Sequence, residues 1–312
     1  MWDCGHRHAS SQSRYVARVS RHVETIEEWQ KRGSVHSLLG HDVFVIDEPA
    51  EVEEAEPALV LHGFPTSSYD WQHALPVLRA RRRVVLLDYP GYGFSAKPDI
   101  AYSLFAQADV VEACARELGL GDVALVTHDV GDSIGGELLA RELDGSLGFH
   151  VTRRVLTNGS IYMDLVQLSK GQLGLLALPD AALPPESRLP ADGIATGLHV
   201  TFAPGSAVDP EELRNMAELV TRNEGDRILP RMIRYIEERK VHEGRWTGAI
   251  ESHPAPLHVI WGDLDPIAVW PMAERLGSVR PDAVVDRLDG VGHYPMVEAP
   301  ARFNVALEAA LG

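Results

Sequence analysis

The stretch VALVTHDVGDSIGG, residues Val123–Gly136, decides the fold of this chain. A short run of β-branched and apolar residues ends at Thr127, and a helical pattern rich in leucine and alanine runs from Ile134 to Arg141. Between them lies a tight turn with small residues on both sides. The stretch therefore predicts a strand, a sharp elbow and a helix, an arrangement that lifts one side chain above the carboxyl edge of a parallel sheet.

Two residues compete for the raised position in this elbow. The segment Gly131–Gly135 matches G-x-S-x-G, which would make Ser133 the nucleophile of an esterase or lipase. Ser133 lies six residues beyond Thr127, however, and would fall in the first or second turn of the helix, where hydroxyl residues are common. Asp129 lies at the right distance from the strand. We expect Asp129 to be the raised side chain and keep Ser133 as the alternative.

Length and composition set outer limits on the fold and the partners. The chain has 312 residues, 45% of them hydrophobic, enough for one α/β domain with an insertion or for two modest domains. A formal charge of −16 disfavours nucleic acid and anionic membranes as partners. No run approaches the ~20 apolar residues that a membrane span needs.

The cysteines and the N-terminus bear on the compartment. Cys4 and Cys114 lie far apart and lack metal-ligand spacing, which favours a reducing, cytoplasmic environment. Residues 1–22 lack the apolar core of a secretion signal and are predicted to be a disordered extension. Arginine greatly outnumbers lysine, which is typical of a GC-rich bacterial genome.

The rest of the chain predicts one sheet with a helical insertion. Short apolar segments at 35–39 and 43–46 predict an antiparallel hairpin, and helical patterns cover 23–31, 67–80 and 102–118. The runs suited to buried parallel strands are Ala58–Leu61, Arg83–Leu87, Arg154–Thr157, Leu257–Trp261 and Ala283–Leu288. This alternation predicts a mostly parallel, doubly wound sheet. We expect residues 23–157 and 251–312 to form the core and residues 158–250 to form a helical cap, with helices at 165–178, 210–223 and 228–240.

An acid and a histidine follow the last two core strands. Asp265 lies in the loop after Leu257–Trp261, and His293 lies in a Gly-His turn after the last strand. Asp263 is the rival acid, but it directly follows a turn glycine, whereas Asp265 lies further along the loop. The order nucleophile, acid, base is that of hydrolases with a strand-elbow-helix nucleophile.

Each of these residue types fits a step of covalent catalysis. A carboxylate at Asp129 can attack carbon and become an ester, which water then cleaves with His293 as the base. Asp265 would hold the imidazole in one tautomer. The amides of Phe64, in the turn after Ala58–Leu61, and of Val130 would form an oxyanion hole.

Five segments carry a family resemblance: His62–Pro65, Asp88–Ser95, His128–Gly131, Gly262–Pro266 and Gly292–His293. Over about residues 35 to 312, the chain resembles the epoxide hydrolase and haloalkane dehalogenase group of the α/β-hydrolase superfamily. The segments Asn158–Ile161 and 222–246 resemble the mesoderm-specific transcript branch, whose members are epoxide-hydrolase-like. The resemblance implies the α/β-hydrolase fold with an inserted cap.

Departures from the group favour one activity within it. Dehalogenases of this group carry a tryptophan after the nucleophile and often an asparagine in the preceding turn, where this chain has Val130 and Phe64. The arginine that fluoroacetate dehalogenases place after the nucleophile is also absent. The resemblance therefore implies hydrolysis of an epoxide, a small apolar electrophile, to a vicinal diol, without a metal or organic cofactor.

Ring opening in this family uses cap tyrosines as acids. A phenol is protonated at neutral pH and can donate to the developing alkoxide. Tyr235 matches the family's cap tyrosine, and a second one is not evident, so Tyr162 and His199 are the remaining candidates for substrate binding. A serine esterase using Ser133, a haloalkane dehalogenase and a non-catalytic ligand-binding protein stay open as alternatives, as does a homodimer.

Overall fold

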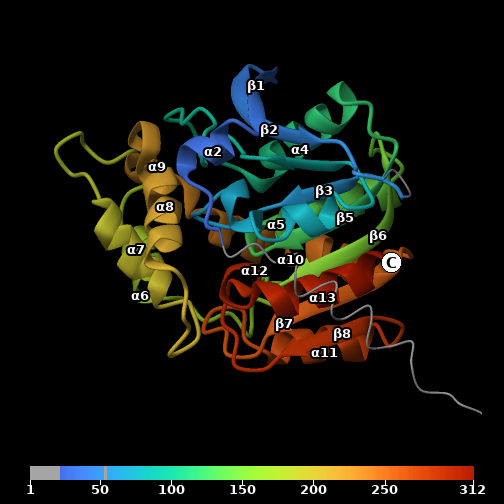
Figure 1. Ribbon diagram of the computed structural model, residues 1–312. Coiled ribbons are helices and arrows are strands. Elements are labelled where there is room, and N and C mark those ends of the chain that lie inside the picture. Colours follow the sequence, from blue (N-terminus) through green and yellow to red (C-terminus); the bar gives the residue numbers. More distant parts are fainter. Residues whose placement is uncertain (1–21, 53–54) are drawn as a thin grey trace, which may run out of the picture.

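The computed structural model describes residues 22–52 and 55–312 (Figure 1). The predicted extension at residues 1–22 lies outside this part except for its last residue. The described strands are β1 (Gly33–Leu38), β2 (His41–Glu48), β3 (Ala58–Leu61), β4 (Val84–Leu87), β5 (Asp122–His128), β6 (His150–Thr157), β7 (Leu257–Gly262) and β8 (Val284–Leu288).

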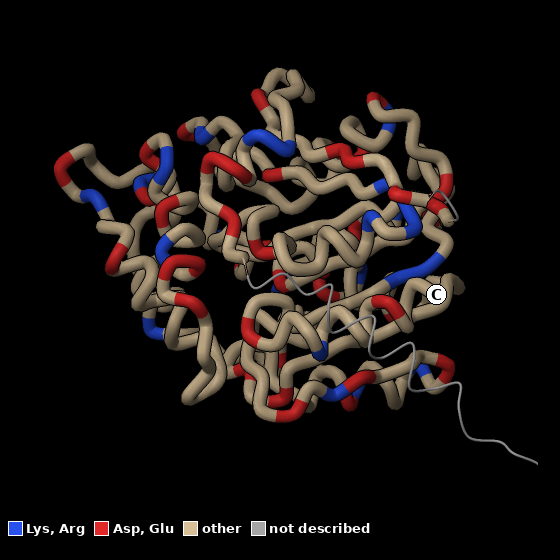
Figure 2. The backbone as a smooth tube through the Cα atoms, viewed as in Figure 1, with Lys and Arg blue, Asp and Glu red and all other residues tan. Residues whose placement is uncertain are grey.

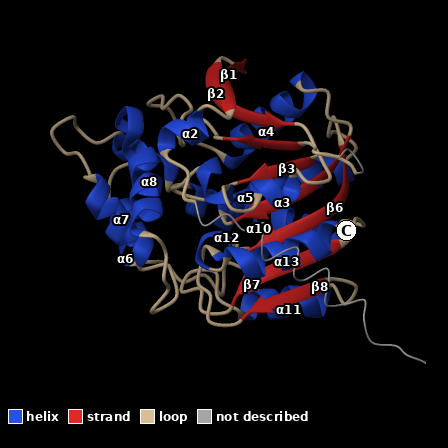
Figure 3. Cartoon of the chain, viewed as in Figure 1, coloured by secondary structure: helices blue, strands red, loops and turns tan. Residues whose placement is uncertain are grey.

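These strands form one sheet, and the helices outside the segment between β6 and β7 lie on both of its sides (Figure 3). Those of the core are α2 (Ile26–Gln30), η1 (Ser68–Trp71), α3 (Leu75–Leu78), α4 (Leu104–Glu117), α5 (Val130–Leu143), α11 (Pro271–Val279), α12 (Pro295–Glu298) and α13 (Pro300–Leu311). Between β6 and β7 the chain forms α6 (Lys170–Leu176), α7 (Ala191–His199), α8 (Pro210–Thr221), η2 (Arg222–Glu224), α9 (Gly225–Met232) and α10 (Tyr235–Ser252).

The strands form one sheet in the order β1-β2-β4-β3-β5-β6-β7-β8. β2 pairs antiparallel with both β1 and β4, and the remaining neighbours run parallel. The predicted hairpin and the mostly parallel, doubly wound sheet are therefore confirmed. Because parallel strands end at the same edge, the loops after β3, β5, β6, β7 and β8 gather there.

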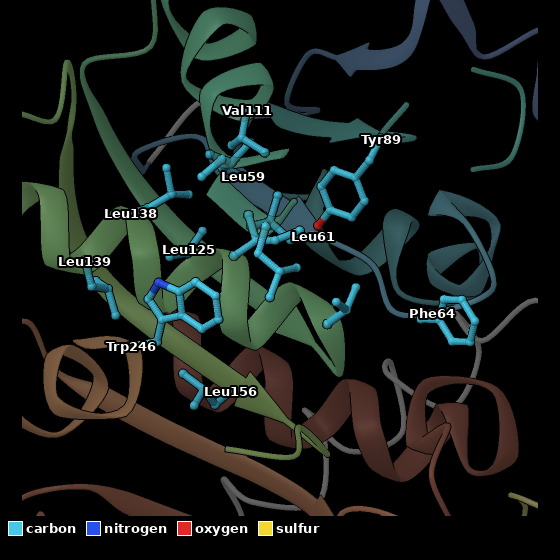
Figure 4. Close-up of a cluster of buried hydrophobic side chains, with 14 of the residues drawn as sticks. Leu59, Leu61, Phe64, Tyr89, Val111, Leu125, Leu138, Leu139, Leu156 and Trp246 are labelled. Atoms are coloured by element: carbon cyan, nitrogen blue, oxygen red, sulfur yellow. The ribbon is translucent and has the colours of Figure 1, made fainter. Parts of the chain in front are cut away.

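Both faces of the central strands are buried, which explains why they read as continuous apolar runs. Successive side chains of a strand point to opposite faces. Leu59 and Leu61 pack with Leu138 and Trp246 on the face covered by α4, α5, α10 and α11 (Figure 4). Val60 belongs to the other cluster, with side chains of α2, α3 and α13.

Two predicted helical stretches are divided in the structure, and one helix was not predicted. The stretch 67–80 is two short pieces, η1 and α3, because Pro76 has no N–H to continue a helix across the gap. The stretch 228–240 is divided between α9 and α10, so that Tyr235 begins a new helix. Helix α7 was not predicted, because Pro190 and two glycines within it weaken the helical pattern.

The inserted helices take two positions. Helices α6 to α9 lie together beyond one end of the strands, on the left of Figure 1, whereas α10 returns to pack on α5. Acidic and basic residues are interleaved along the chain (Figure 2). One ion pair, between Arg275 and Asp164 at 2.7 Å, joins α11 to the segment after β6. That residues 158–250 form a separate cap domain stays a prediction. Within the described residues, no helix has the length and apolar character needed to cross a membrane.

Candidate active site

Asp129 occupies the elbow between β5 and α5. Its backbone has φ 51° and ψ −110°, a conformation that costs a non-glycine residue energy and is concentrated at functional sites. The neighbouring glycines are required by packing. A Cβ at Gly131 would lie 2.8 Å from the carbonyl oxygen of Leu61, and one at Gly63 would lie 2.8 Å from the Cβ of Asp129. The elbow therefore presses closely against the turn after β3.

One backbone amide bonds to the Asp129 carboxylate, and a second begins the helix that follows it. The Phe64 N–H donates a hydrogen bond of 2.8 Å to Oδ2 of the buried Asp129. Val130 is the first residue of α5, so its N–H belongs to the helix terminus, where intrahelical acceptors are absent and the helix dipole favours negative charge. Phe64 and Val130 thus lie where the sequence predicts an oxyanion hole.

His293 and Asp265 form a buried pair at the same edge of the sheet. His293 Nδ1–H donates to Asp265 Oδ2 at 2.7 Å, which leaves Nε2 for other partners. Burial alone would lower the pKa of His293. The charge and hydrogen bond of Asp265, together with the charge of Asp129, outweigh burial and raise this pKa to about 9. The ring of His128, the residue before Asp129, lies 5.0 Å from the ring of His293, which places this pair beside the elbow.

Asp265 is held by several donors, one of which the sequence reasoning missed. The amides of Ile267 and Ala268 donate to Oδ1 at 2.7 and 3.0 Å, and Asn158 Nδ2 donates to Oδ2 at 2.8 Å. Asn158 directly follows β6, so its position at the shared edge was the signal that could have found it. Asp263, the rival acid, instead pairs with Arg287 at 2.8 Å.

Ser133 lies in the first turn of α5, and its side chain faces α10. Its Oγ accepts a hydrogen bond of 2.8 Å from Arg239 Nε. Arg239 is buried, and its guanidinium carbon lies 5.0 Å from the centre of the Tyr235 ring. The sequence did not point to Arg239, because the helical segment around it contains many charged residues, and such side chains usually face solvent.

Tyr235 is buried at the start of α10, and its ring centre lies 5.3 Å from that of Phe64. Burial, followed by the negative charge of Asp129, raises the pKa of its hydroxyl; Arg239 and a hydrogen bond with Gln172 oppose the rise. Gln172 lies on α6, and its Oε1 accepts from the Ser169 amide at 2.8 Å. Tyr235 is thus a protonated phenol near Asp129.

A cavity of about 400 Å³ lies beside these groups. Its walls come from α6, α7 and the loops after β3, β7 and β8, and its lining is largely apolar. Phe64, whose amide bonds to Asp129, and His293, which bonds to Asp265, are among its lining residues, whereas Asp129 and Tyr235 are not. Gln172 and Thr201 also line it, so a few polar groups converge on an apolar space, as in small-molecule sites.

Comparison with known proteins identifies the family of this chain. The sequence model of the alpha/beta hydrolase family matches residues 58–306. The chain belongs to this family.

The relatives of this alpha/beta hydrolase carry several names. It is 37% identical to the putative hydrolase LipZ of Mycobacterium tuberculosis, over 90% of this chain and 96% of that protein. It is 34% identical to the mesoderm-specific transcript protein of Mus musculus, over 89% and 85% of the two chains. A haloalkane dehalogenase of Agrobacterium fabrum is 36% identical over 44% of this chain and 46% of its own length.

Solved structures support the fold of this alpha/beta hydrolase. Cfl2 from Burkholderia cenocepacia superposes with a TM-score of 0.74 at 19% identity, covering 90% of this chain and 95% of that one. The expected fold and the expected resemblance to the epoxide hydrolase and dehalogenase group are therefore confirmed.

Tyr162 and His199, the two predicted substrate-binding residues of this hydrolase, lie outside the lining of the cavity. The Tyr162 hydroxyl donates to Glu251 at 2.8 Å, and Arg275 covers its ring at 4.6 Å. His199 is exposed at the end of α7, with its ring 6.2 Å from that of Phe202. Neither residue lines the cavity, and the partners just named do not line it either, whereas Asp129 and Tyr235 both contact the lining residue Phe64. The geometry therefore does not support these two assignments.

Proposed function

We propose that this hydrolase opens an epoxide to a vicinal diol through a covalent ester on Asp129. The observation that carries the proposal is the carboxylate at the elbow, which accepts a hydrogen bond from the Phe64 amide and lies beside the buried pair of His293 and Asp265. The competing hydroxyl, Ser133, is instead bonded to Arg239. A serine nucleophile needs a base within hydrogen-bonding reach, and here its partner is a cation.

In the first step, an Asp129 oxygen bonds to a carbon of the epoxide ring while the bond from that carbon to the ring oxygen breaks. The ring oxygen takes the proton of the Tyr235 hydroxyl. Burial keeps this phenol protonated, and its ring lies 5.3 Å from that of Phe64, whose amide bonds to Asp129. General acid help of this kind contributes about 10²–10⁴-fold to the rate.

In the second step, water attacks the carboxyl carbon of the ester and passes a proton to His293. The oxyanion that forms is stabilised by the amides of Phe64 and Val130. When the intermediate collapses, the ester oxygen leaves with the proton from His293. The proton left on Asp129 returns to the Tyr235 phenolate, so the sum is epoxide plus water to diol.

The charge of Asp129 also acts on the base. Together with the larger effect of Asp265, it raises the pKa of His293 to about 9 against the effect of burial. Ester formation removes the charge of Asp129, so this pKa falls. The imidazolium then releases its proton to water, and the neutral ring accepts a proton from the attacking water.

Dehalogenation is the second candidate, because part of the chain is similar to a haloalkane dehalogenase and an aspartyl ester would serve both reactions. A leaving halide needs side-chain N–H donors, and both Val130 and Phe64 have apolar side chains. An epoxide keeps its leaving oxygen attached and needs an acid instead, which Tyr235 supplies.

A single turnover of styrene oxide in H₂¹⁸O, with enzyme in excess, tests the proposal. Because water attacks the carboxyl carbon, we expect one ¹⁸O in the Asp129 peptide and none in the first diol. Label in the diol alone would contradict the covalent route. The Asp129→Ala variant should lose turnover, whereas the matched Ser133→Ala variant should keep it. Esterase activity lost only in Ser133→Ala would favour the serine enzyme, and halide release from haloalkanes would favour the dehalogenase.

A further inference from the structure

We infer that the substrate carries a bulky apolar substituent about the size of two aromatic rings, and that four glycines on α6 and α7 make room for it. The inference rests on the proposed epoxide hydrolysis and names the substrate class of that site. It comes from the cavity walls, where Gly171 and Gly174 of α6 face the same space as Gly193 and Gly197 of α7.

These glycines are not required by the backbone. All four lie inside helices and have helical rather than positive φ angles. A Cβ added at Gly174 or Gly197 would have at least 4 Å of clearance from other atoms in the described part of the chain. Glycine is among the least favourable residues for a helix interior, so its repeated use in two short helices weakens them without a local structural reason.

The space beside these glycines supplies the reason. All four line the cavity, and in each helix the two glycines lie three or four residues apart, so they share the helix face that borders the space a ligand would fill. The other residues of these helices in the lining include Leu175, Ile194 and Leu198. An apolar group placed between the helices would thus meet aliphatic side chains and bare backbone.

The cavity volume sets the size of that group. A dry cavity of about 150 Å³ accommodates a benzene ring, so about 400 Å³ holds two rings and leaves space for the epoxide. Phe64 and His293 line the cavity on the side of Asp129, so the reactive carbons would face that side and the substituent would extend toward α6 and α7. A substrate as small as propylene oxide would leave most of this apolar wall unfilled.

The test compares three epoxides of increasing size: propylene oxide, styrene oxide and trans-stilbene oxide. We expect kcat/KM of the unmodified protein to rise along this series. The Gly197→Leu variant should lower kcat/KM for stilbene oxide at least tenfold, as expected when a few carbon atoms obstruct an apolar pocket, and change that for propylene oxide less than twofold. The control is Gly244→Leu on α10, a helical glycine with equal clearance outside the cavity lining, which should leave all three unchanged.

A binding measurement separates this inference from the proposed chemistry. Hydrobenzoin, the unreactive diol of stilbene oxide, should bind the unmodified protein at least tenfold more tightly than Gly197→Leu in titration calorimetry. Such binding without turnover of any epoxide would refute the reaction and still support the bulky apolar ligand. Equal turnover of all three epoxides, or equal effects of Gly197→Leu and Gly244→Leu, would overturn the inference.

Discussion

Replacing Asp265 with asparagine should change how the stability of the protein depends on pH. The charge and hydrogen bond of Asp265 are the main groups that raise the pKa of His293, from 6.5 to about 9, against the opposing effect of burial. In Asp265→Asn that charge is lost, burial predominates, and the pKa of His293 falls. A shift of this size corresponds to up to about 3 kcal/mol of differential stability at 1.36 kcal/mol per pH unit.

The sign follows from proton linkage. Because the folded protein binds the His293 proton more tightly than the unfolded chain, this contribution is fully present below about pH 6.5 and is lost as the pH rises through 9. Urea unfolding of both proteins at pH 6.5 and pH 10 measures it. We expect the difference in free energy of unfolding between native protein and variant to shrink at the higher pH.

Other titrating groups cancel in this comparison. Burial lowers the pKa of Lys97 to about 8, and that contribution is common to both proteins. A difference between native protein and variant that stays constant from pH 6.5 to pH 10 would refute the reasoning. It would mean that Asp265 acts through packing and not through the charge of His293.

Three further substitutions test the surroundings of the site. Gly131→Ala should destabilise the protein by about 1–3 kcal/mol in urea unfolding, because its Cβ would press on backbone carbonyls, whereas Gly244→Ala on open helix should not; equal effects would contradict this. Glu137→Ala should cost about 3 kcal/mol by the same measurement, since Glu137 accepts from Trp246 Nε1 at 2.9 Å and pairs with two arginines; a loss below about 0.5 kcal/mol would be incompatible. Gln172→Leu should lower kcat up to about tenfold with little change in KM, because the Tyr235 hydroxyl loses a hydrogen-bonding partner; an unchanged kcat would remove Gln172 from the site.

The parts of the fold that follow from local pattern were predictable from the sequence. The strands at the centre of the sheet read as apolar runs because both of their faces are covered, and turn residues mark their ends. The relation of Asp129 to Thr127 locates the elbow, because the spacing between strand and turn is a local property.

The neighbours of the site residues were less predictable, because they depend on how distant elements pack. Gln172 meets Tyr235 only because α6 folds over the start of α10, and Arg239 meets Ser133 only because α10 lies on α5. Tyr162 and His199 were chosen for residue type within the inserted segment. Residue type does not show which side of a helix or turn will face the cavity.

The reacting groups lie on helices that are held together more firmly than the helix in the cavity wall. Arg239 bonds to Ser133, Glu137 bonds to Trp246, and Gly136 allows the Trp246 backbone to approach closely, so the helix that begins at Tyr235 is clamped to the helix that follows Asp129. The residues of α6, by contrast, are only half-buried or exposed. Warming or mild denaturant should therefore loosen α6, which forms part of the cavity wall, before it separates α10 from α5. Substrate binding should then weaken while the distance between Tyr235 and Asp129 is still preserved.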